Sequence, residues 1–408
     1  LFIPKSFIQK EAEHVEGFSP ELATVTHAGG KELEEPLIVR PTSETIINHM
    51  FSKWIKSHRD LPMLINQWAN VVRWEMRTRL FLRTSEFLWQ EGHTAHQTKE
   101  EATQEALQML DIYEEFTQQV AAVKVIKGTK SEIEKFAGAK VTYSIEAMML
   151  DKKALQAGTS HELGQNFSKA FEIQYSDEQN QLAHPYQTSW GVSTRLIGMI
   201  IMAHGDDKGL KLPPAIAPIQ VVIIPIIPKN TDPDEILRAA DKIKNSLPDI
   251  RVKIDDREEV SPGFKFNEWE LKGVPLRIEI GPKDIEQKSV IVARRDIVDS
   301  KTKISIETLP SEIIKTLDLI QNDMFKVTED FLSANTSHAN DMDELLSQLK
   351  DNDGFVSCYW FEDKEDELKV KELTKATIRC YPLENTEEKL SVNKTDLHGK
   401  YAIFSKSY

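Results

Sequence analysis

Four arginines fall within eleven positions of an acidic chain. They are Arg73, Arg77, Arg79 and Arg83 in the stretch VVRWEMRTRLFLRTSEFLWQEGHTAH, residues 71–96, whereas the whole 408-residue chain has a formal net charge of −14. One guanidinium group can bond two oxygens of a phosphate or carboxylate. A local cluster of arginines is therefore typical of a site that binds a polyanion. The alternative is a solvent-exposed hairpin in which these arginines form a ladder of salt bridges with nearby glutamates.

Alternation along this stretch predicts two strands joined by a loop. On the first strand, one face carries Val71, Arg73 and Glu75, and the other, which packs inward, carries Val72, Trp74 and Met76. On the returning strand, one face carries Phe87, Trp89, Glu91 and His93. Arg77 and Arg79 fall in the connecting loop. A face that combines arginine, carboxylates, aromatic rings and imidazole can bind a phosphate, stack on a base and hold an amine.

Helices and further strands must hold this hairpin in place. The sequence predicts one helix within residues 43–58 and another over 97–122, with Thr98 as its cap, followed by the segment VKVIKGT at 123–129 and a polar helix. The next polar segment, around Gly158 and Gly164, is equally compatible with a plain loop and with part of a site.

A second domain is expected after the proline-rich run KLPPAIAPIQ, residues 211–220, because no helix interior would accept these prolines. Beyond it the pattern is strand, helix, strand, helix, strand, strand, which implies a mixed sheet with helices packed on it. A long helix and a small α/β unit then complete the chain. The expected domains are residues 1–215, 216–325 and 326–408.

Composition excludes several classes of protein. The longest mostly apolar run, residues 219–228, contains two prolines and is about half the ~20 residues that a membrane-spanning helix needs. The N-terminus lacks the pattern of a secretory signal. Two cysteines, Cys358 and Cys380, are too few for a disulfide framework. We therefore expect a cytoplasmic protein with no membrane contact.

Four motifs, in order, carry a resemblance to a known family. They are RPTSET at 40–45, FLRTSEFLWQEGHTA at 81–95, GTSHELGQNFSK at 158–169 and SWGVSTRLIG at 189–198. Together they resemble the archaeal and eukaryotic type of prolyl-tRNA synthetase, a class II aminoacyl-tRNA synthetase. SPGFKFNEWELKGVPLRIEIGPKD, residues 261–284, is similar to that family's anticodon-binding domain. The resemblance extends over residues 1–330 and the final FSKSY, and it displaces the exposed-hairpin interpretation.

The resemblance implies an α+β class II catalytic domain with a mainly antiparallel sheet, then an α/β anticodon-binding domain and a small C-terminal α/β domain. It implies activation of L-proline with ATP and transfer of the prolyl group to the 3′ end of tRNA(Pro). Mg²⁺ would accompany ATP without side-chain ligands. The implied catalytic residues are Arg73 and Arg195. The residues implied to bind ATP are Arg73, Glu75, Arg83, Thr84, Phe87, Gln156, Thr159, Ser193 and Arg195. Those implied to bind proline are Thr42, Glu44, Arg73, Trp89, Glu91, His93, His161, Trp190 and Gly191.

Contacts with tRNA follow from the same resemblance. The positions implied to contact the anticodon are Glu270, Arg277 and Asp284, and the alternative is that these are ordinary surface charges. Arg77 and Arg79 would meet the acceptor end. Many relatives hold zinc on four C-terminal cysteines, but this chain has Phe361 and Asp366 where the first pair would fall, so we expect no zinc. The family's terminal tyrosine, whose carboxylate reaches toward the catalytic domain, matches Tyr408.

Some features depart from the family pattern. Only the end of the first class II motif is present, around Pro4, which indicates either an omitted upstream segment, the interpretation we favour, or a truncated paralogue. The 122 positions between Arg73 and Arg195 leave no room for an editing domain, so we expect none in this chain, and a separate editing protein is one possible partner. We expect a homodimer, with other synthetases as further possible partners. The alternatives are a catalytically inactive tRNA-binding paralogue and another class II synthetase of the same subgroup.

Overall fold

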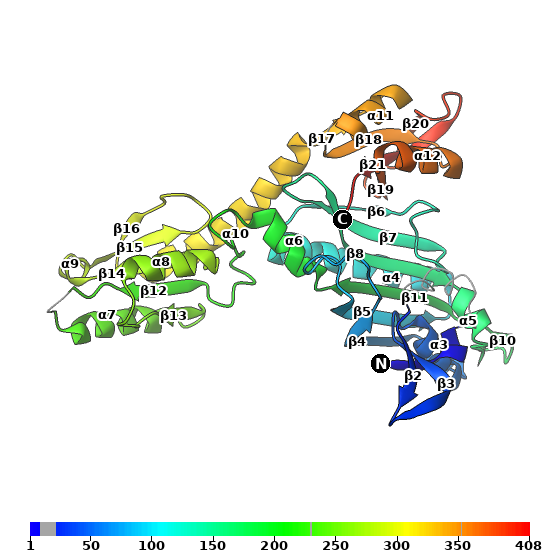
Figure 1. Ribbon diagram of the computed structural model, residues 1–408, viewed down its shortest axis with the longest axis horizontal. Helices are drawn as coiled ribbons and strands as arrows, with labels where there is room; N and C mark the ends of the chain where they lie inside the picture. Colours follow the sequence, from blue (N-terminus) through cyan, green and yellow to red (C-terminus); the bar gives the residue numbers. More distant parts are fainter. Residues whose placement is uncertain (9–21, 229–230, 352) are drawn as a thin grey trace. The chain divides into compact units, whose positions relative to one another are not determined.

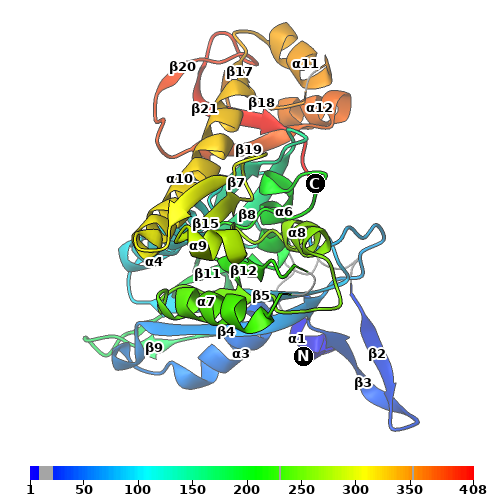
Figure 2. The same cartoon turned by 90° about the vertical axis from the view of Figure 1, so that its left-hand side faces the viewer.

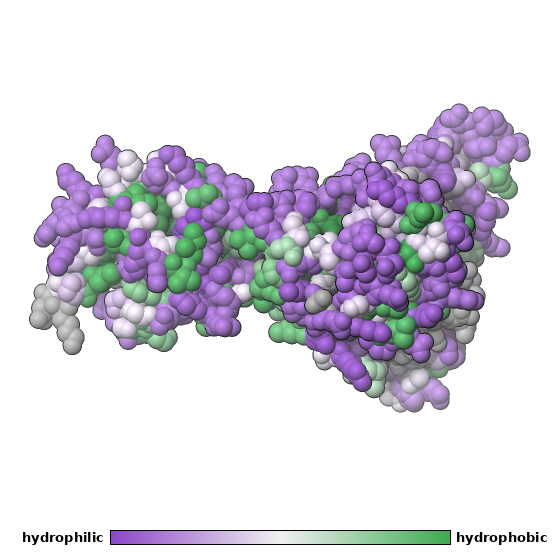
Figure 3. Space-filling model, turned by 90° about the horizontal axis from the view of Figure 1, so that it is seen from above, coloured by the Kyte–Doolittle hydropathy of each residue, from purple (hydrophilic) through white to green (hydrophobic). Residues whose placement is uncertain are grey.

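The computed structural model describes residues 1–8, 22–228, 231–351 and 353–408. These residues form two compact units, coloured along the chain in Figure 1. The first unit comprises Leu1–Glu115, Val125–Met199 and Asn335–Tyr408, and the second comprises Phe116–Lys124 and Ile200–Ala334. On the face shown in Figure 3, hydrophilic side chains dominate the surface and apolar ones form scattered patches.

A largely antiparallel sheet is the centre of the first unit. In spatial order its strands are β17, β18, β21, β19, β6, β7, β8, β11, β5 and β4, and β20 pairs with β21. The strands nearest the predicted site are β4 (Met63–Val72), β5 (Glu86–His96), β6 (Val125–Thr129), β7 (Val141–Met148), β8 (Ala154–Gly164) and β11 (Tyr186–Ser193). Helix α4 (Lys99–Glu115) covers one face of β8 and β11 and buries Ala106 and Leu110. The opposite face of these strands is therefore free to form a site.

The C-terminal residues extend the same sheet. They form β17 (Thr336–His338), α11 (Met342–Asp351), β18 (Phe355–Trp360), α12 (Lys364–Thr374), β19 (Thr377–Pro382), β20 (Glu388–Leu390) and β21 (His398–Ser405). Strand β19 pairs with β6 through Tyr381 and Thr129. Gly128 permits this approach, because a Cβ there would lie 2.5 Å from the Tyr381 carbonyl oxygen. Figure 2 shows α11 and α12 beside these strands.

Shorter elements complete the first unit. They are β1 (Phe2–Pro4), α1 (Lys5–Ile8), β2 (Thr24–Ala28), β3 (Lys31–Val39), α3 (Glu44–Trp54), η2 (His58–Asp60), α5 (Asn166–Ala170), β9 (Tyr175–Ser176) and β10 (Leu182–Ala183). Strands β1, β3 and β2 form a small separate sheet. Helix α6 (Arg195–His204) begins in this unit and ends in the second.

The second unit contains a mixed sheet of order β13, β12, β14, β15, β16 with helices packed on it. Its elements are η3 (Phe116–Val120), β12 (Val221–Pro225), α7 (Pro233–Asn245), β13 (Val252–Ile254), α8 (Pro262–Leu271), β14 (Leu276–Ile280), α9 (Pro282–Glu286), β15 (Ser289–Arg294), β16 (Thr302–Ser305) and α10 (Leu309–Ala334). Strands β12, β13 and β14 are parallel, as the alternation of strands and helices predicts.

The expected fold class is confirmed, two local predictions are wrong, and one alternative that the sequence left open is resolved. Strand β4 ends at Val72, so Trp74 and Met76 do not pack inward; their side chains are 61% and 85% exposed. Residues 154–164, which could have been a loop, form strand β8. The polar helix expected after residue 129 is instead a series of turns over 132–139, where the backbone NH groups of Glu134 and Lys135 both bond to the Ser131 carbonyl.

Candidate active site

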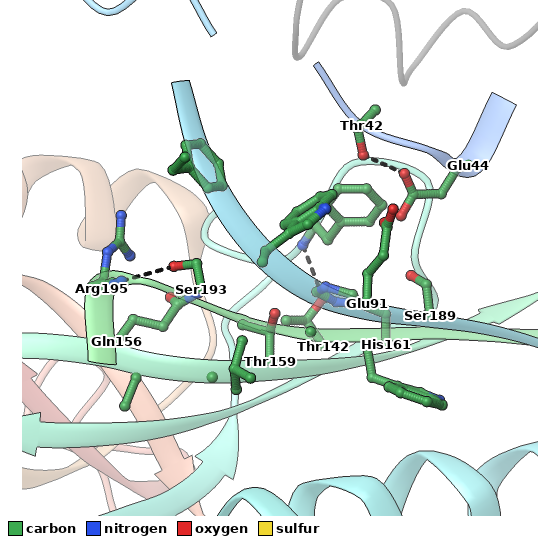
Figure 4. A pocket seen from close by; sticks show the side chains of 18 of the residues that line it. Thr42, Glu44, Glu91, Thr142, Gln156, Thr159, His161, Ser189, Ser193 and Arg195 are labelled. Atoms are coloured by element: carbon green, nitrogen blue, oxygen red, sulfur yellow. Dashed lines mark hydrogen bonds between the residues drawn. The ribbon is translucent and has the colours of Figure 1, made fainter. Parts of the chain in front are cut away.

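The predicted residues gather in a cleft of about 270 Å³ on the face of the sheet opposite α4 (Figure 4). The orientation follows from β8, where Ser160 donates a hydrogen bond of 2.7 Å to the Ala106 carbonyl of α4 while its neighbours Thr159 and His161 line the cleft. The predicted residues that line it are Thr42, Glu44, Arg73, Phe87, Trp89, Glu91, His93, Gln156, Thr159, His161, Trp190, Gly191, Ser193 and Arg195.

The remaining predicted nucleotide residues, Glu75, Arg83 and Thr84, line an adjoining depression of about 200 Å³. This depression shares Arg73 and Arg195 with the main cleft. The structure therefore brings together every catalytic-domain residue that the sequence selected for ATP and proline.

A β-bulge places two of these residues. Gln156 and Thr159 are three positions apart, so strict alternation would point their side chains to opposite faces of β8. The register between β7 and β8 shifts between Ile145 and Glu146, which pair with Gly158 and Gln156 and leave Ala157 as the extra residue. Because the bulge changes the phase of the strand, both side chains reach the cleft.

Acidic side chains and imidazoles form one end of the cleft. Thr42 Oγ1 donates to Glu44 Oε2. Glu91 Oε1 accepts hydrogen bonds of 2.5 Å from Ser43 Oγ and 2.6 Å from Gln67 Nε2. Glu91 Oε2 lies 2.9 Å from His93 Nε2. These residues are 5% exposed or less where they line the cleft, so their charges act with little screening by solvent.

The pKa values of the two histidines at this end shift in opposite directions. Burial lowers the pKa of His93, but the hydrogen bond with Glu91 and the negative charges of Glu44 and Glu91 outweigh burial, so its pKa is raised. Burial lowers the pKa of His161 to about 4, with His93 adding to the shift and Glu44 opposing it. His161 is therefore a neutral imidazole at pH 7. The two carboxylates outnumber His93, the one imidazole here with a raised pKa, so the pocket is net negative and suits an ammonium group.

Arginines form the other end. Arg73 Nε donates to the Pro41 carbonyl over 3.1 Å, and its guanidinium lies 5.5 Å from the centre of the Phe87 ring. Arg195 Nε donates to the Leu82 carbonyl over 3.1 Å. Burial lowers the pKa of Arg195 to about 10, with contributions from Arg83 and Arg73, so it stays charged at neutral pH. Arg73 and Arg83 are close enough to Arg195 to lower its pKa, so the three arginines form a natural site for an anion.

Trp190 lines the cleft in a different way from that expected of a pocket wall. Its ring would collide with a Cβ on Gly92, and it lies edge-on to Tyr113 of α4 with ring centres 6.5 Å apart. The indole therefore faces the helix-covered side of the sheet, whereas its neighbours Ser189 and Gly191 face the cleft.

Sequence reasoning missed seven residues that line the cleft: Ser189, Val192, Thr142, Glu134, Phe136, Ala157 and Gly158. Ser189 lies within the motif at 189–198 and alternates with Gly191, so period two along that strand could have found it. Glu134 and Phe136 come from the turns between β6 and β7, and no local pattern marked them.

The predicted anticodon residues divide into two places in the second unit. Glu270 and Arg277 line a cleft of about 140 Å³ together with Trp269, Arg294 and Lys301. Asp284 is not among the lining residues of this cleft; its carboxylate accepts a 2.9 Å hydrogen bond from the Gly281 backbone NH at the start of α9.

The C-terminal residue lies close to the loop between β4 and β5. The ring of Tyr408 is 5.7 Å from the Arg79 guanidinium, and its carbonyl oxygen accepts a 3.5 Å hydrogen bond from Arg83. Within the described ranges, no group of three or more His, Cys, Asp or Glu side chains could hold a metal ion. No helix among the described residues is both long and apolar enough to cross a membrane.

Three family models match the chain in order. They are the tRNA synthetase class II core domain (G, H, P, S and T) at residues 24–204, an anticodon-binding domain at 220–316 and the prolyl-tRNA synthetase C-terminal domain at 342–408. With the antiparallel sheet and its arginine-lined cleft, they define a class II aminoacyl-tRNA synthetase.

Individual relatives narrow this class. A proline–tRNA ligase of Arabidopsis thaliana, described as chloroplastic/mitochondrial, is 55% identical in a 415-position alignment that covers 100% of this chain and 76% of the relative. The proline–tRNA ligase of Roseiflexus sp. (strain RS-1) is 54% identical over 95% of this chain and 81% of its own length. A prolyl-tRNA synthetase from Cryptosporidium parvum, solved with halofuginone and AMPPNP, is similar with a TM-score of 0.94 at 43% identity, over 100% of this chain and 86% of that one. The chain belongs to the prolyl-tRNA synthetase family, which confirms the resemblance seen in its motifs.

Proposed function

We propose that the protein activates L-proline with ATP to prolyl-adenylate and pyrophosphate, and then transfers the prolyl group to the 3′ end of tRNA(Pro). The observation that carries this proposal is the polarity of one continuous cleft. It has a net negative, histidine-lined pocket at one end and the guanidinium groups of Arg73 and Arg195 at the other. The ammonium group of an amino acid requires a negative pocket, and the phosphates of a nucleoside triphosphate require positive charges beside it.

In the amino-acid pocket, Glu44 and Glu91 would attract the secondary ammonium of proline, with Thr42 holding Glu44 in place. Trp89 would form the wall against the apolar ring, and the neutral His161 would close the far side without repelling the ammonium. For Trp190 and Gly191 we propose a contribution through the backbone, because the Trp190 ring is packed against Gly92.

At the nucleotide end, we assign Phe87 to stacking on adenine and Glu75 to its amino group. Gln156, Thr159, Thr84 and Arg83 would surround the ribose and phosphates. Ser193 would support Arg195 at the distal phosphates, since its Oγ accepts a 3.2 Å hydrogen bond from the Arg195 backbone NH. The many oxygens of ATP fit this cationic wall, and Mg²⁺ bound with ATP would neutralise further phosphate charge.

Arg73 has the central role in this proposal. It lines both the main cleft and the adjoining depression, so we assign it to the point where the proline carboxylate would attack the α-phosphate. A guanidinium can bond an oxygen of each reactant and offset the charge that develops on the phosphate. Positioning and electrostatics would thus supply the catalysis without a side-chain base.

For tRNA, we propose that Glu270 and Arg277 read anticodon bases from their shared cleft and that Asp284 contributes from the start of α9. The catalytic, anticodon-binding and C-terminal domains would correspond to residues 1–215, 216–325 and 326–408. Arg77 and Arg79, in the exposed loop after β4, would meet the acceptor end.

We further propose a homodimer in the cytosol. An apolar face on β4 and β5, opposite the cleft, supports the dimer: Leu64, Trp68 and Leu88 are 56%, 84% and 61% exposed. Light scattering would measure the oligomeric state. The fully buried thiols of Cys358 and Cys380 suit a reducing compartment, and imaging of a tagged protein would distinguish the cytosol from an organelle like that of the Arabidopsis relative.

Proline-dependent exchange of labelled pyrophosphate into ATP tests the proposed function. We expect Arg73→Ala to lower exchange by at least about 100-fold, the usual effect of removing a group that stabilises transition-state charge. Arg77→Ala is the matched control, because it removes an arginine from the nearby loop and should leave exchange intact while slowing transfer to tRNA. If the native protein binds tRNA but catalyses no exchange, it is an inactive tRNA-binding paralogue.

A further inference from the structure

The turns between β6 and β7 form one wall of the amino-acid pocket. Glu134 and Phe136 line the cleft. The Phe136 ring stacks on His161, with ring centres 4.6 Å apart and an angle of 28° between the planes. The Phe136 backbone NH donates a 2.9 Å hydrogen bond to Thr142 Oγ1, which lies 3.0 Å from His161 Nδ1. Two contacts, the stacked rings and the hydrogen bonds through Thr142, therefore couple the position of this segment to the orientation of His161.

The other side of the same segment is held by helix α12 of the C-terminal domain. Ser131 Oγ donates a 2.6 Å hydrogen bond to Glu367 Oε1. Lys371 Nζ lies 3.0 Å from Glu134 Oε1. The two partners of the first contact are 236 positions apart in the sequence. These contacts bracket the segment 131–134, and Phe136 follows two residues later.

Packing alone does not explain a buried glutamate at position 367. Its side chain is almost wholly buried, and burying an ionisable carboxyl costs free energy that an apolar side chain would not. Burial raises its pKa to about 7; Ser131 and Lys371 oppose the shift, and Glu134 and Glu362 reinforce it. The hydrogen bond that Glu367 accepts from Ser131 of the pocket segment is a role that an apolar side chain could not fill.

We propose that α12 positions the segment 131–136 against the amino-acid pocket, with Glu367 and Lys371 as positioning residues for proline binding. Neither residue lines the cleft, so each acts through its partner, Ser131 or Glu134. This inference rests on the proposed function, and it assigns helix α12 a role in binding proline but not in binding ATP. If these contacts only held the C-terminal domain in place, their removal would lower stability and would not change the KM for one substrate more than for the other.

The test begins with proline-dependent pyrophosphate exchange by the native full-length protein. If the native protein shows no exchange, the proposed function fails, independently of the inference about α12. With exchange established, the KM values for proline and for ATP are measured separately in Lys371→Ala and Ser131→Ala. We expect the proline KM to rise about twofold to fivefold in Lys371→Ala, as for an exposed ion pair, and about tenfold in Ser131→Ala, which loses a hydrogen bond to a carboxyl group. The ATP KM should change less than about twofold, because Phe136 of the held segment stacks on His161 at the proline end of the cleft.

Two further variants separate positioning from general damage. Lys369→Ala removes an exposed lysine from the same helix and should leave both KM values unchanged. Lys371→Glu should raise the proline KM, because it places a carboxylate beside Glu134 in place of the ammonium group. Unchanged proline KM in both Lys371→Ala and Ser131→Ala would overturn the proposal. An equal rise of the two KM values would also overturn it.

Discussion

Replacing Glu146 with glutamine would leave two buried cations without their counter-ion. Glu146 Oε1 lies 2.6 Å from Lys130 Nζ, and Oε2 lies 2.9 Å from Arg379 Nη2. The three side chains are 0%, 2% and 6% exposed, respectively. Burial raises the pKa of Glu146, but Arg379 and Lys130 outweigh burial and the pKa is lowered, so the carboxylate is charged in the folded protein. It joins the C-terminal domain to β6 and β7.

The expected loss is about 3–5 kcal/mol of unfolding free energy, which is the usual effect of removing one partner from a buried ion pair. For a unit of this size such a loss lowers the melting temperature by roughly 6–20 °C. Burial already lowers the pKa of Lys130, so its deprotonation relieves part of the repulsion and the loss should be smaller at high pH.

Scanning calorimetry and near-ultraviolet circular dichroism of the full chain would measure this loss. Glu132→Gln is the matched control, since that glutamate is 46% exposed on the neighbouring turn and its replacement should change stability by less than about 0.5 kcal/mol. The double variant Glu146→Gln/Arg379→Met should recover part of the loss. An unchanged melting temperature in Glu146→Gln would refute the reasoning that this charge cluster stabilises the packing of the C-terminal domain on β6 and β7.

Three further predictions concern single residues of the first unit. The pKa of His161 is about 4 when folded and about 6.5 when unfolded, so stability should fall by up to about 3 kcal/mol as pH drops through this window, and His161→Gln should reduce the fall in urea titrations. Glu367 has a raised pKa of about 7, so its contribution is complete below pH 4.5 and is lost as pH rises through 7; Glu367→Gln should flatten stability between pH 5 and 8. Gly92→Ala would place a Cβ 2.0 Å from the Trp190 ring and should cost about 1–3 kcal/mol in thermal unfolding, whereas unchanged stability would show that the ring can move away freely.

Period-two reasoning was most successful on β5. Phe87, Trp89, Glu91 and His93 were placed on one face of a strand, and all four line the cleft. The same reasoning failed after Val72, because pairing with β5 ends there and the chain enters an exposed loop in which alternation has no meaning. Asp284 was grouped with Glu270 and Arg277 by similarity alone, and it lies at a helix start outside their cleft.

The sequence by itself determined the family, the order of the domains and the identity of the side chains around Arg73, because the motifs are long, contiguous and placed on regular strands. Only the tertiary structure decided which residues from distant segments complete the pocket. The bulge at Ala157 sets the phase of β8, and Phe136 reaches His161 from a turn that carries no periodic pattern. Contacts such as Ser131 with Glu367, 236 positions apart, arise when strand pairing and burial bring separate segments together, and no local spacing encodes them.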